Sequence, residues 1–220
     1  MESQRKMRNR RQVGVLVLTA AALMVPPLAF GDPPTTQISV RDDSFSPREP
    51  AVMQFGGRFS WVRAANATGE HNVHQVAGLF SSGNPTTTSF TPAHPYSISP
   101  SAGTYSYYCD AHRALNMVGK IKVRAIVETG TLTSNGFRVR WASASSKPTG
   151  TRFDVRFQVG SGPWTTWRND TTSADGAFGT GNQPVDVMPG HTYRIEVRSE
   201  KQQVSKHSDW SPPLVVNTPS

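Results

Sequence analysis

Short runs in which apolar and polar residues alternate recur along most of this chain, from residue 37 almost to its end. They are rich in Val, Ile, Phe, Tyr and Trp, and clusters of Gly, Pro, Ser, Asn and Thr separate them. Alternation with a period of two residues is typical of β-strands that bury one face, and no amphipathic helical pattern follows residue 31. The pattern therefore predicts an all-β protein.

The alternating runs fall into two groups, residues 36–124 and 128–216, joined by the short segment 125–127, which contains no Gly, Pro or Ser spacer. A chain of this length has room for two modest domains. We expect two Greek-key β-sandwiches in tandem that abut with limited freedom. The strands expected in the first group span residues 37–40, 52–55, 59–63, 71–75, 96–98, 104–109 and 119–124.

The N-terminal segment, residues 1–31, has the layout of a secretory signal peptide. A basic cluster precedes the apolar run 13–25, and Ala29-Phe30-Gly31 offers a small-residue cleavage site. The alternative is an uncleaved membrane anchor, but Pro26 and Pro27 interrupt the run short of the ~20 apolar residues that a spanning helix needs. The segment predicts a secreted or extracytoplasmic protein of the periplasm or cell envelope.

Part of the chain's strong positive charge lies in this N-terminal segment. The full chain has 23 basic and 15 acidic residues, and five of the basic residues and one of the acidic residues lie in residues 1–31. The remainder has a mild positive charge and no run of Lys or Arg. A charge of this size serves solubility, so we expect no nucleic-acid partner.

A single cysteine, Cys109, raises the question of chemistry. Thiols oxidise outside the cytoplasm, and one cysteine cannot form an internal disulfide, which leaves a buried inert thiol, an intermolecular bridge or a metal ligand. His112 and Met117 follow in the next loop, and His71 lies upstream. A thiolate, two imidazoles and a weak axial thioether are the blue-copper donor set.

Each of these residues also has an ordinary structural explanation. A free cysteine on an inward strand face is often a small hydrophobe, and a methionine often fills a core. His74 competes with His71 as a ligand, but strand alternation turns it to the opposite face. The combination of four residues in order favours the metal site.

The four candidate ligands stand among other characteristic segments: His71-Asn72-Val73, Asp43-Ser44-Phe45-Ser46-Pro47, Trp61, Phe80-Ser81-Ser82-Gly83, Gly103-Thr104-Tyr105 and Tyr107-Tyr108-Cys109. Through these segments and the spacing of the four residues, residues 36–124 resemble the small cupredoxins of the plastocyanin, pseudoazurin and amicyanin kind. The resemblance implies that His71, Cys109 and His112 are equatorial ligands and Met117 the axial ligand of one copper ion, with Asn72 tying the ligand loops together through hydrogen bonds. One departure is Asn116, where the family usually has Gly; Asn tolerates a left-handed backbone better than most residues.

The resemblance implies a one-electron carrier that cycles between Cu(I) and Cu(II). Four protein ligands leave no open position for a substrate, so we do not expect an enzyme. Arg113, Ala114 and Leu115, beside His112, would form the docking patch for redox partner proteins, which such carriers meet in small, transient contacts.

The second group of runs contains several characteristic segments: Phe137-Arg138-Val139-Arg140-Trp141, Phe153-Asp154-Val155-Arg156-Phe157-Gln158-Val159, the segment from Met188 to Val197, and Ser208-Asp209-Trp210-Ser211-Pro212-Pro213. Through these segments, residues 128–216 resemble a fibronectin type III domain, which implies a second sandwich that positions the first or contacts a cell-envelope protein or glycan. Tyr193, just after Pro189-Gly190, fits a tyrosine corner. Trp164 and Trp167 are either ordinary packing or an aromatic binding surface.

Two other functions remain open from the sequence. One is an extracytoplasmic copper carrier or storage protein, whose site would exchange metal readily. The other is an envelope adhesion or scaffold protein in which the copper fold has lost its role, since sandwiches of this kind host many functions.

Overall fold

The computed structural model describes residues 33–147, 150–179, 185–201 and 206–220. The expected signal peptide, residues 1–31, lies outside these ranges. Within them, no helix has the length and apolar character needed to cross a membrane.

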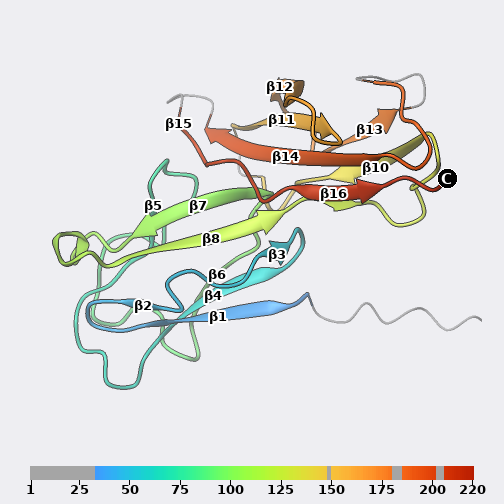
Figure 1. The fold of residues 1–220 in the computed structure, drawn as a ribbon. Coiled ribbons are helices and arrows are strands. Elements are labelled where there is room, and N and C mark those ends of the chain that lie inside the picture. The colour runs from blue at the N-terminus through green and yellow to red at the C-terminus, as the bar shows by residue number, and fades with distance from the viewer. Residues whose placement is uncertain (1–32, 148–149, 180–184, 202–205) are drawn as a thin grey trace, which may run out of the picture. The chain divides into compact units, whose positions relative to one another are not determined.

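Two four-stranded sheets form the N-terminal sandwich (Figure 1). The first sheet has the order β2-β1-β4-β6, and the second has the order β3-β8-β7-β5. The strands of the first are β1 (Thr35–Val40), β2 (Phe45–Ser46), β4 (Arg58–Arg63) and β6 (Tyr96–Ile98). The strands of the second are β3 (Met53–Gln54), β5 (His74–Gln75), β7 (Gly103–Tyr108) and β8 (Val118–Arg124).

The core of this sandwich follows from strand alternation. On β8, Gly119, Ile121 and Val123 are buried while the residues between them are half-buried. On β7 the inward face carries Tyr105 and Tyr107, and Cys109 continues that face just past the end of the strand with no exposed surface. The sequence therefore places the sulfur inside, at one end of the sandwich.

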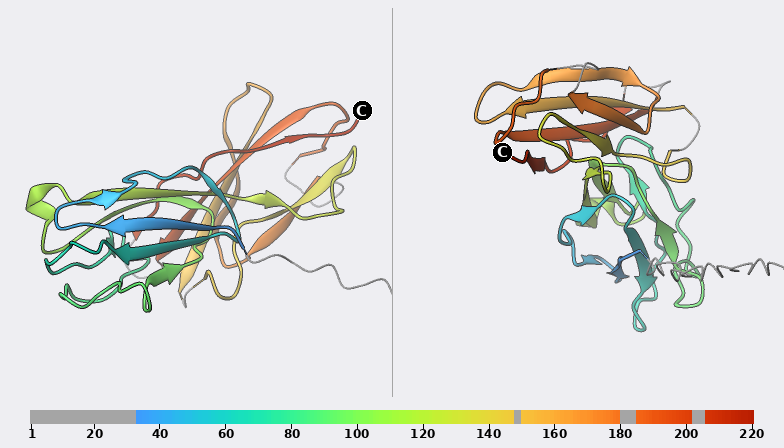
Figure 2. Two further views of the ribbon diagram at one scale, coloured as in Figure 1. Left: turned by 90° about the horizontal axis from the view of Figure 1, so that it is seen from below. Right: turned by 90° about the vertical axis from the view of Figure 1, so that its right-hand side faces the viewer.

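The C-terminal sandwich pairs a three-stranded sheet, β13-β10-β9, with a larger sheet in which β12-β11-β14-β15 is extended by β16 on β14 (Figure 2). Trp141, Phe178 and Tyr193 are fully buried between the sheets. The strands are β9 (Ile126–Val127), β10 (Gly136–Arg140), β11 (Thr151–Val159), β12 (Thr165–Thr171), β13 (Asp175–Gly179), β14 (Thr192–Lys201), β15 (Lys206–His207) and β16 (Leu214–Asn217). The described residues thus form an all-β protein with two sandwiches in tandem, which confirms the expected fold class.

The aromatic residues of the second sandwich take structural positions. The Tyr193 hydroxyl accepts a hydrogen bond from the Met188 backbone N–H at 2.8 Å, the contact expected of a tyrosine corner. Trp167 is 6 % exposed and packs edge-on against Trp141 and Phe178, so its ring is core and not a binding surface.

The two sandwiches are joined through β7. Ala125, between them in the chain, is fully buried in the core of the second sandwich. The Tyr105 hydroxyl lies 2.9 Å from Ser199 Oγ on β14, and Thr104 and Asp209 exchange two backbone hydrogen bonds of 3.1 and 3.0 Å. The strand that leads to Cys109 is therefore anchored at its start by the second sandwich.

The strand expected over residues 71–75 is wrong in its first half. Only His74 and Gln75 form β5, and His71 makes a single bridge to Thr86. The backbone around His71 turns away from the sheet because its hydrogen bonds go to the segment near Thr86, and this places the His71 side chain in the interior.

Candidate metal centre

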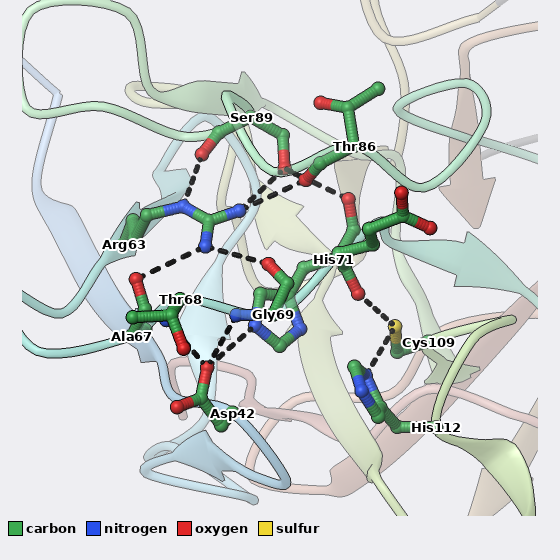
Figure 3. Close-up of polar contacts among 11 residues, drawn as sticks. Asp42, Arg63, Ala67, Thr68, Gly69, His71, Thr86, Ser89, Cys109 and His112 are labelled. Atoms are coloured by element: carbon green, nitrogen blue, oxygen red, sulfur yellow. Dashed lines mark hydrogen bonds and ion pairs between the residues drawn. The ribbon is translucent and has the colours of Figure 1, made fainter.

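Three of the four expected ligands converge at one end of the N-terminal sandwich (Figure 3). His71 comes from the loop before β5, Cys109 from the end of β7, and His112 from the loop between β7 and β8. Their candidate donor atoms all lie within 4.8 Å of one another. The Cys109 Sγ lies 3.5 Å from His112 Nδ1, so that nitrogen already faces the sulfur.

Met117 closes the same loop. Its backbone N–H donates to the carbonyl of His112 at 3.2 Å, and its carbonyl accepts from the Cys109 N–H at 3.1 Å. The Met117 side chain is fully buried. The loop therefore folds back on itself and brings the Met117 backbone beside Cys109 and His112.

Asn116 adopts the left-handed conformation that its position requires, with φ 61° and ψ 31°. It ends the short 3-10 helix η1 (Arg113–Leu115), and its N–H donates to the Arg113 carbonyl. Asn is among the few side chains that enter this region at modest cost. The substitution of Asn for the usual Gly is thus compatible with the loop.

His71 is the most enclosed of the donors, with no exposed surface. Neither of its ring nitrogens makes a hydrogen bond within the described part of the chain. Burial lowers the pKa of His71, and the nearby Arg63 cation lowers it further, while Asp42 opposes both. A buried, neutral imidazole with an unsatisfied nitrogen is suited to bind a metal ion, because metal ligands must be deprotonated.

The donor set also fits copper in its chemistry. A thiolate and two imidazoles, with a thioether beside them, match the trigonal site with a weak axial ligand, whereas carboxylate and carbonyl donors would favour magnesium or calcium. The residues present therefore fit a copper ion.

Asn72 connects the two ligand-bearing loops. Its side-chain amide donates to the Gly83 carbonyl at 2.8 Å and to Asp110 Oδ2 at 2.6 Å, and its Oδ1 accepts from the Asp110 N–H at 2.8 Å. Because Asp110 directly follows Cys109, these bonds hold the segment after His71 against the segment after the cysteine. This is the contact that the sequence analysis expected of Asn72.

His74 lies outside the donor cluster. Its Nδ1 is 3.1 Å from Asp110 Oδ2, and its ring stacks on Tyr108 with centroids 5.1 Å apart. The side chain is 38 % exposed, whereas His71 is buried. The two histidines therefore separate as expected, but strand alternation is not the reason, because His71 lies outside β5.

Asp42 and Arg63 are part of this region although no motif pointed to them. Asp42 Oδ1 lies 3.5 Å from His71 Nε2. The Arg63 guanidinium donates to the carbonyls of Ala67, Gly69, Thr86 and Ser89 on the two segments that flank His71 (Figure 3). Neither residue belongs to the ligand pattern of the sequence, so only the fold reveals them.

The expected docking patch lies at the surface. Arg113, Ala114 and Leu115 are all exposed, and Leu115 has 66 % of its surface accessible. His112, next to them, is half-buried. The Arg113 guanidinium carbon lies 4.3 Å from the centre of the Tyr108 ring, which holds the cation at one side of the patch.

Two histidines and one cysteine, of which His71 and Cys109 are buried, form a group that can hold a metal ion. Residues 44–124 match the family model for copper binding proteins of the plastocyanin/azurin family. The chain therefore carries a plastocyanin/azurin-type copper-binding domain whose His–Cys–His group can hold one copper ion.

The other comparisons add little. No curated protein matches the chain. One solved structure, that of the selenomethionine-substituted chicken interferon gamma receptor alpha chain, shares 11 % identity over 71 % of this chain and 88 % of that chain, with a TM-score of 0.32. Likeness at this level carries no argument about function.

Proposed function

We propose that this protein is an exported mononuclear type 1 copper protein that carries single electrons. The observation that carries the proposal is the convergence of the buried His71 and Cys109 with the half-buried His112, with Met117 in the same loop as His112. A bound copper ion would supply one-electron exchange between Cu(I) and Cu(II). The chain's own residues would provide a rigid site that changes little between the two states.

We propose that the protein is an electron carrier and not an enzyme. Catalytic metal sites keep a position open for water or substrate, and here three donors lie together with the buried Met117 in the same loop. His71, Cys109 and Met117 have no exposed surface, so substrate access to the metal would need the loop to open.

The same burial favours an electron carrier over a copper carrier or storage protein. A site that hands over its metal needs accessible ligands, and only His112 is partly exposed among the four residues. Electrons would leave through the His112 edge, toward partner proteins that rest on Arg113, Ala114 and Leu115. Such encounters are small and transient.

The second sandwich has a supporting role in this proposal. We infer that it is a fibronectin type III module that positions the copper domain or contacts an envelope protein or glycan. The strand pairing and the Tyr193 contact support that assignment. The N-terminal residues support export to an extracytoplasmic compartment.

The test begins with residues 32–220, to which one equivalent of Cu(II) is added. We expect an intense thiolate-to-copper band in the red and an unusually small parallel hyperfine splitting in the electron paramagnetic resonance spectrum. Fast electron self-exchange would support the carrier function. A colourless or ordinary tetragonal Cu(II) spectrum would contradict the type 1 site, and rapid copper transfer to a chelator would favour the copper-carrier alternative.

Cys109→Ser is the decisive substitution, because a hydroxyl is a hard, weak ligand for copper. We expect the red band to disappear in this variant. Circular dichroism of the metal-free protein should stay unchanged, since a serine of similar size fits the same position. A retained red band would show that another residue provides the charge transfer and that the ligand assignment is wrong.

A further inference from the structure

Asp42 occupies a specific position beside the candidate ligand His71. It lies just after β1, and its Oδ1 is 3.5 Å from His71 Nε2. The same oxygen accepts hydrogen bonds from the backbone N–H groups of Thr68 at 2.7 Å and Gly69 at 2.8 Å. The carboxylate is thereby held in place by the loop that leads to His71 (Figure 3).

The Asp42 side chain is 50 % exposed, but the groups around its Oδ1 lie close together. A methyl group added to Gly69 would lie 3.3 Å from Asp42 Oδ1, from His71 Nε2 and from His112 Cε1. Both candidate histidine ligands and the carboxylate therefore meet at this glycine. A side chain at position 69 would press against all three.

Asp42 places a carboxylate acceptor beside a buried imidazole. His71 is fully buried, and within the described ranges Asp42 is the one acidic side chain found beside its ring nitrogens. An imidazole nitrogen that carries a proton in such a place needs an acceptor, and Asp42 is positioned to be that acceptor.

We propose that Asp42 is a positioning residue for the copper site: its carboxylate, 3.5 Å from His71 Nε2, favours the proton on that nitrogen, leaves the Nδ1 lone pair to bind copper, and favours Cu(II) over Cu(I) through its charge. The inference rests on the proposed function. Carboxylates that orient a ligating histidine fix its tautomer and raise its basicity. A fixed anion stabilises the more positive of two oxidation states, which lowers the reduction potential.

Asp42→Asn and Asp42→Ala separate the two effects. The amide introduced by Asp42→Asn can still accept hydrogen bonds from the loop and from His71 but carries no charge, whereas alanine removes both. Asp43→Asn is the matched control: Asp43 is the next residue, is exposed, and the substitution changes the net charge equally.

The first measurement is the His71 ring tautomer in the metal-free chain, from nitrogen-15 chemical shifts. We expect wild-type protein, Asp42→Asn and Asp43→Asn to hold the Nε2–H form and Asp42→Ala to show a mixture. The second measurement is made with copper. We expect Asp42→Ala to weaken Cu(II) binding by about 10- to 100-fold, and Asp42→Asn to raise the reduction potential more than Asp43→Asn does.

The outcomes are separable from those for the proposed function. If wild-type protein shows no red band, the type 1 site is wrong, and the tautomer measurement still decides whether Asp42 orients His71. If the band is present but the Asp42 variants match Asp43→Asn in tautomer, affinity and potential, the inference about Asp42 is overturned and the copper function stands. If Asp42→Ala does not fold, Asp42→Asn alone decides, because it keeps the loop hydrogen bonds.

Discussion

Met117 is expected to adjust the site without defining its colour. As the proposed axial ligand its thioether would be a weak donor, while the intense absorption of such sites comes from the thiolate. Met117→Leu should therefore keep the red band and raise the reduction potential, since losing axial donation disfavours Cu(II). The exchange conserves volume, so stability should fall by less than about 1.5 kcal/mol.

Visible spectroscopy and protein-film voltammetry check this expectation. Met53→Leu serves as the control, because Met53 is also a buried methionine of the same core but lies on β3. A bleached site in Met117→Leu would mean that the thioether is an essential ligand. An unchanged potential would mean that Met117 only fills the core.

Gly69 tests how tightly the site is packed. Its φ does not lie in the left-handed region, so alanine is conformationally acceptable, but the added methyl group would crowd Asp42, His71 and His112 at 3.3 Å. We expect Gly69→Ala to alter the copper spectrum. The reduced entropy of the unfolded chain, about 0.4–1 kcal/mol, should offset much of the crowding in the metal-free protein.

The comparison for Gly69→Ala is Ala65→Ser, which adds one heavy atom at an exposed position of the same loop. Denaturant unfolding and electron paramagnetic resonance are measured on both variants. An unchanged spectrum in Gly69→Ala would show that the histidines have more room than their distances indicate.

At the scale of single residues, the sequence pointed to the candidate ligands but not to the residues that hold them in place. Cys109, His112 and Met117 are close in sequence, so their spacing alone indicated one loop and one site. Asp42 and Arg63 act through backbone N–H and carbonyl groups of the loop before His71, and such contacts carry no residue signature. They depend on β1 and β4 lying side by side, which only the fold provides.

Among the elements, the larger sheet of the second sandwich carries a ladder of stacked side chains. The Arg156 guanidinium carbon lies 4.2 Å from the centre of the Trp210 ring and 4.6 Å from that of Trp164, and Arg198 lies 4.9 Å from Trp210. The two arginines also pair with Glu196 and Asp154. Trp210 thus has two cation contacts and Trp164 has one.

We expect Trp210→Ala to lower the free energy of unfolding by about 2 kcal/mol and Trp164→Ala by about 1 kcal/mol, since each exposed cation–π contact contributes about 0.5–1 kcal/mol and the lost apolar contact adds to it. Urea unfolding followed by circular dichroism measures both. Equal losses of stability in the two variants would indicate that the second cation contact of Trp210 adds nothing to the free energy of unfolding.

Strands were predicted well where apolar and polar residues alternate clearly. They were predicted poorly where the backbone hydrogen-bonds to a loop instead of to a neighbouring strand. The strand expected over residues 96–98 coincides with β6, and the expected 119–124 differs from β8 by one residue. Of the strand expected over residues 71–75, only β5 forms, because the His71 backbone hydrogen-bonds to Thr86 instead of to the sheet. Strands β2 and β5 have only two residues each, too short for any periodic signal.

For the molecule as a whole, the join between the sandwiches bears on the copper site. Tyr105 lies on β7, the strand that ends at Cys109, and its hydroxyl is buried between the Ser101 carbonyl at 2.8 Å and Ser199 Oγ at 2.9 Å. The short segment 125–127 suggested that the sandwiches abut, but no sequence pattern identifies hydroxyl groups that meet across a join. Neither Tyr105 nor Ser199 belongs to a motif that announces this contact, so only the folded structure shows that their hydroxyl groups meet.

A double-mutant cycle with Tyr105→Phe and Ser199→Ala measures whether this contact couples the two sandwiches. Each substitution should cost about 1 kcal/mol, because a buried hydroxyl loses its partner, and the double variant should cost less than the sum by about 0.5–1.5 kcal/mol. Tyr107→Phe is the matched control: Tyr107 is buried on the same face of β7, but its hydroxyl makes no hydrogen bond within the described residues. Its cycle with Ser199→Ala should be additive. Additivity in the Tyr105 cycle as well would mean that the second sandwich does not stabilise β7 through this pair, and that its role lies with a partner and not with the strand that leads to Cys109.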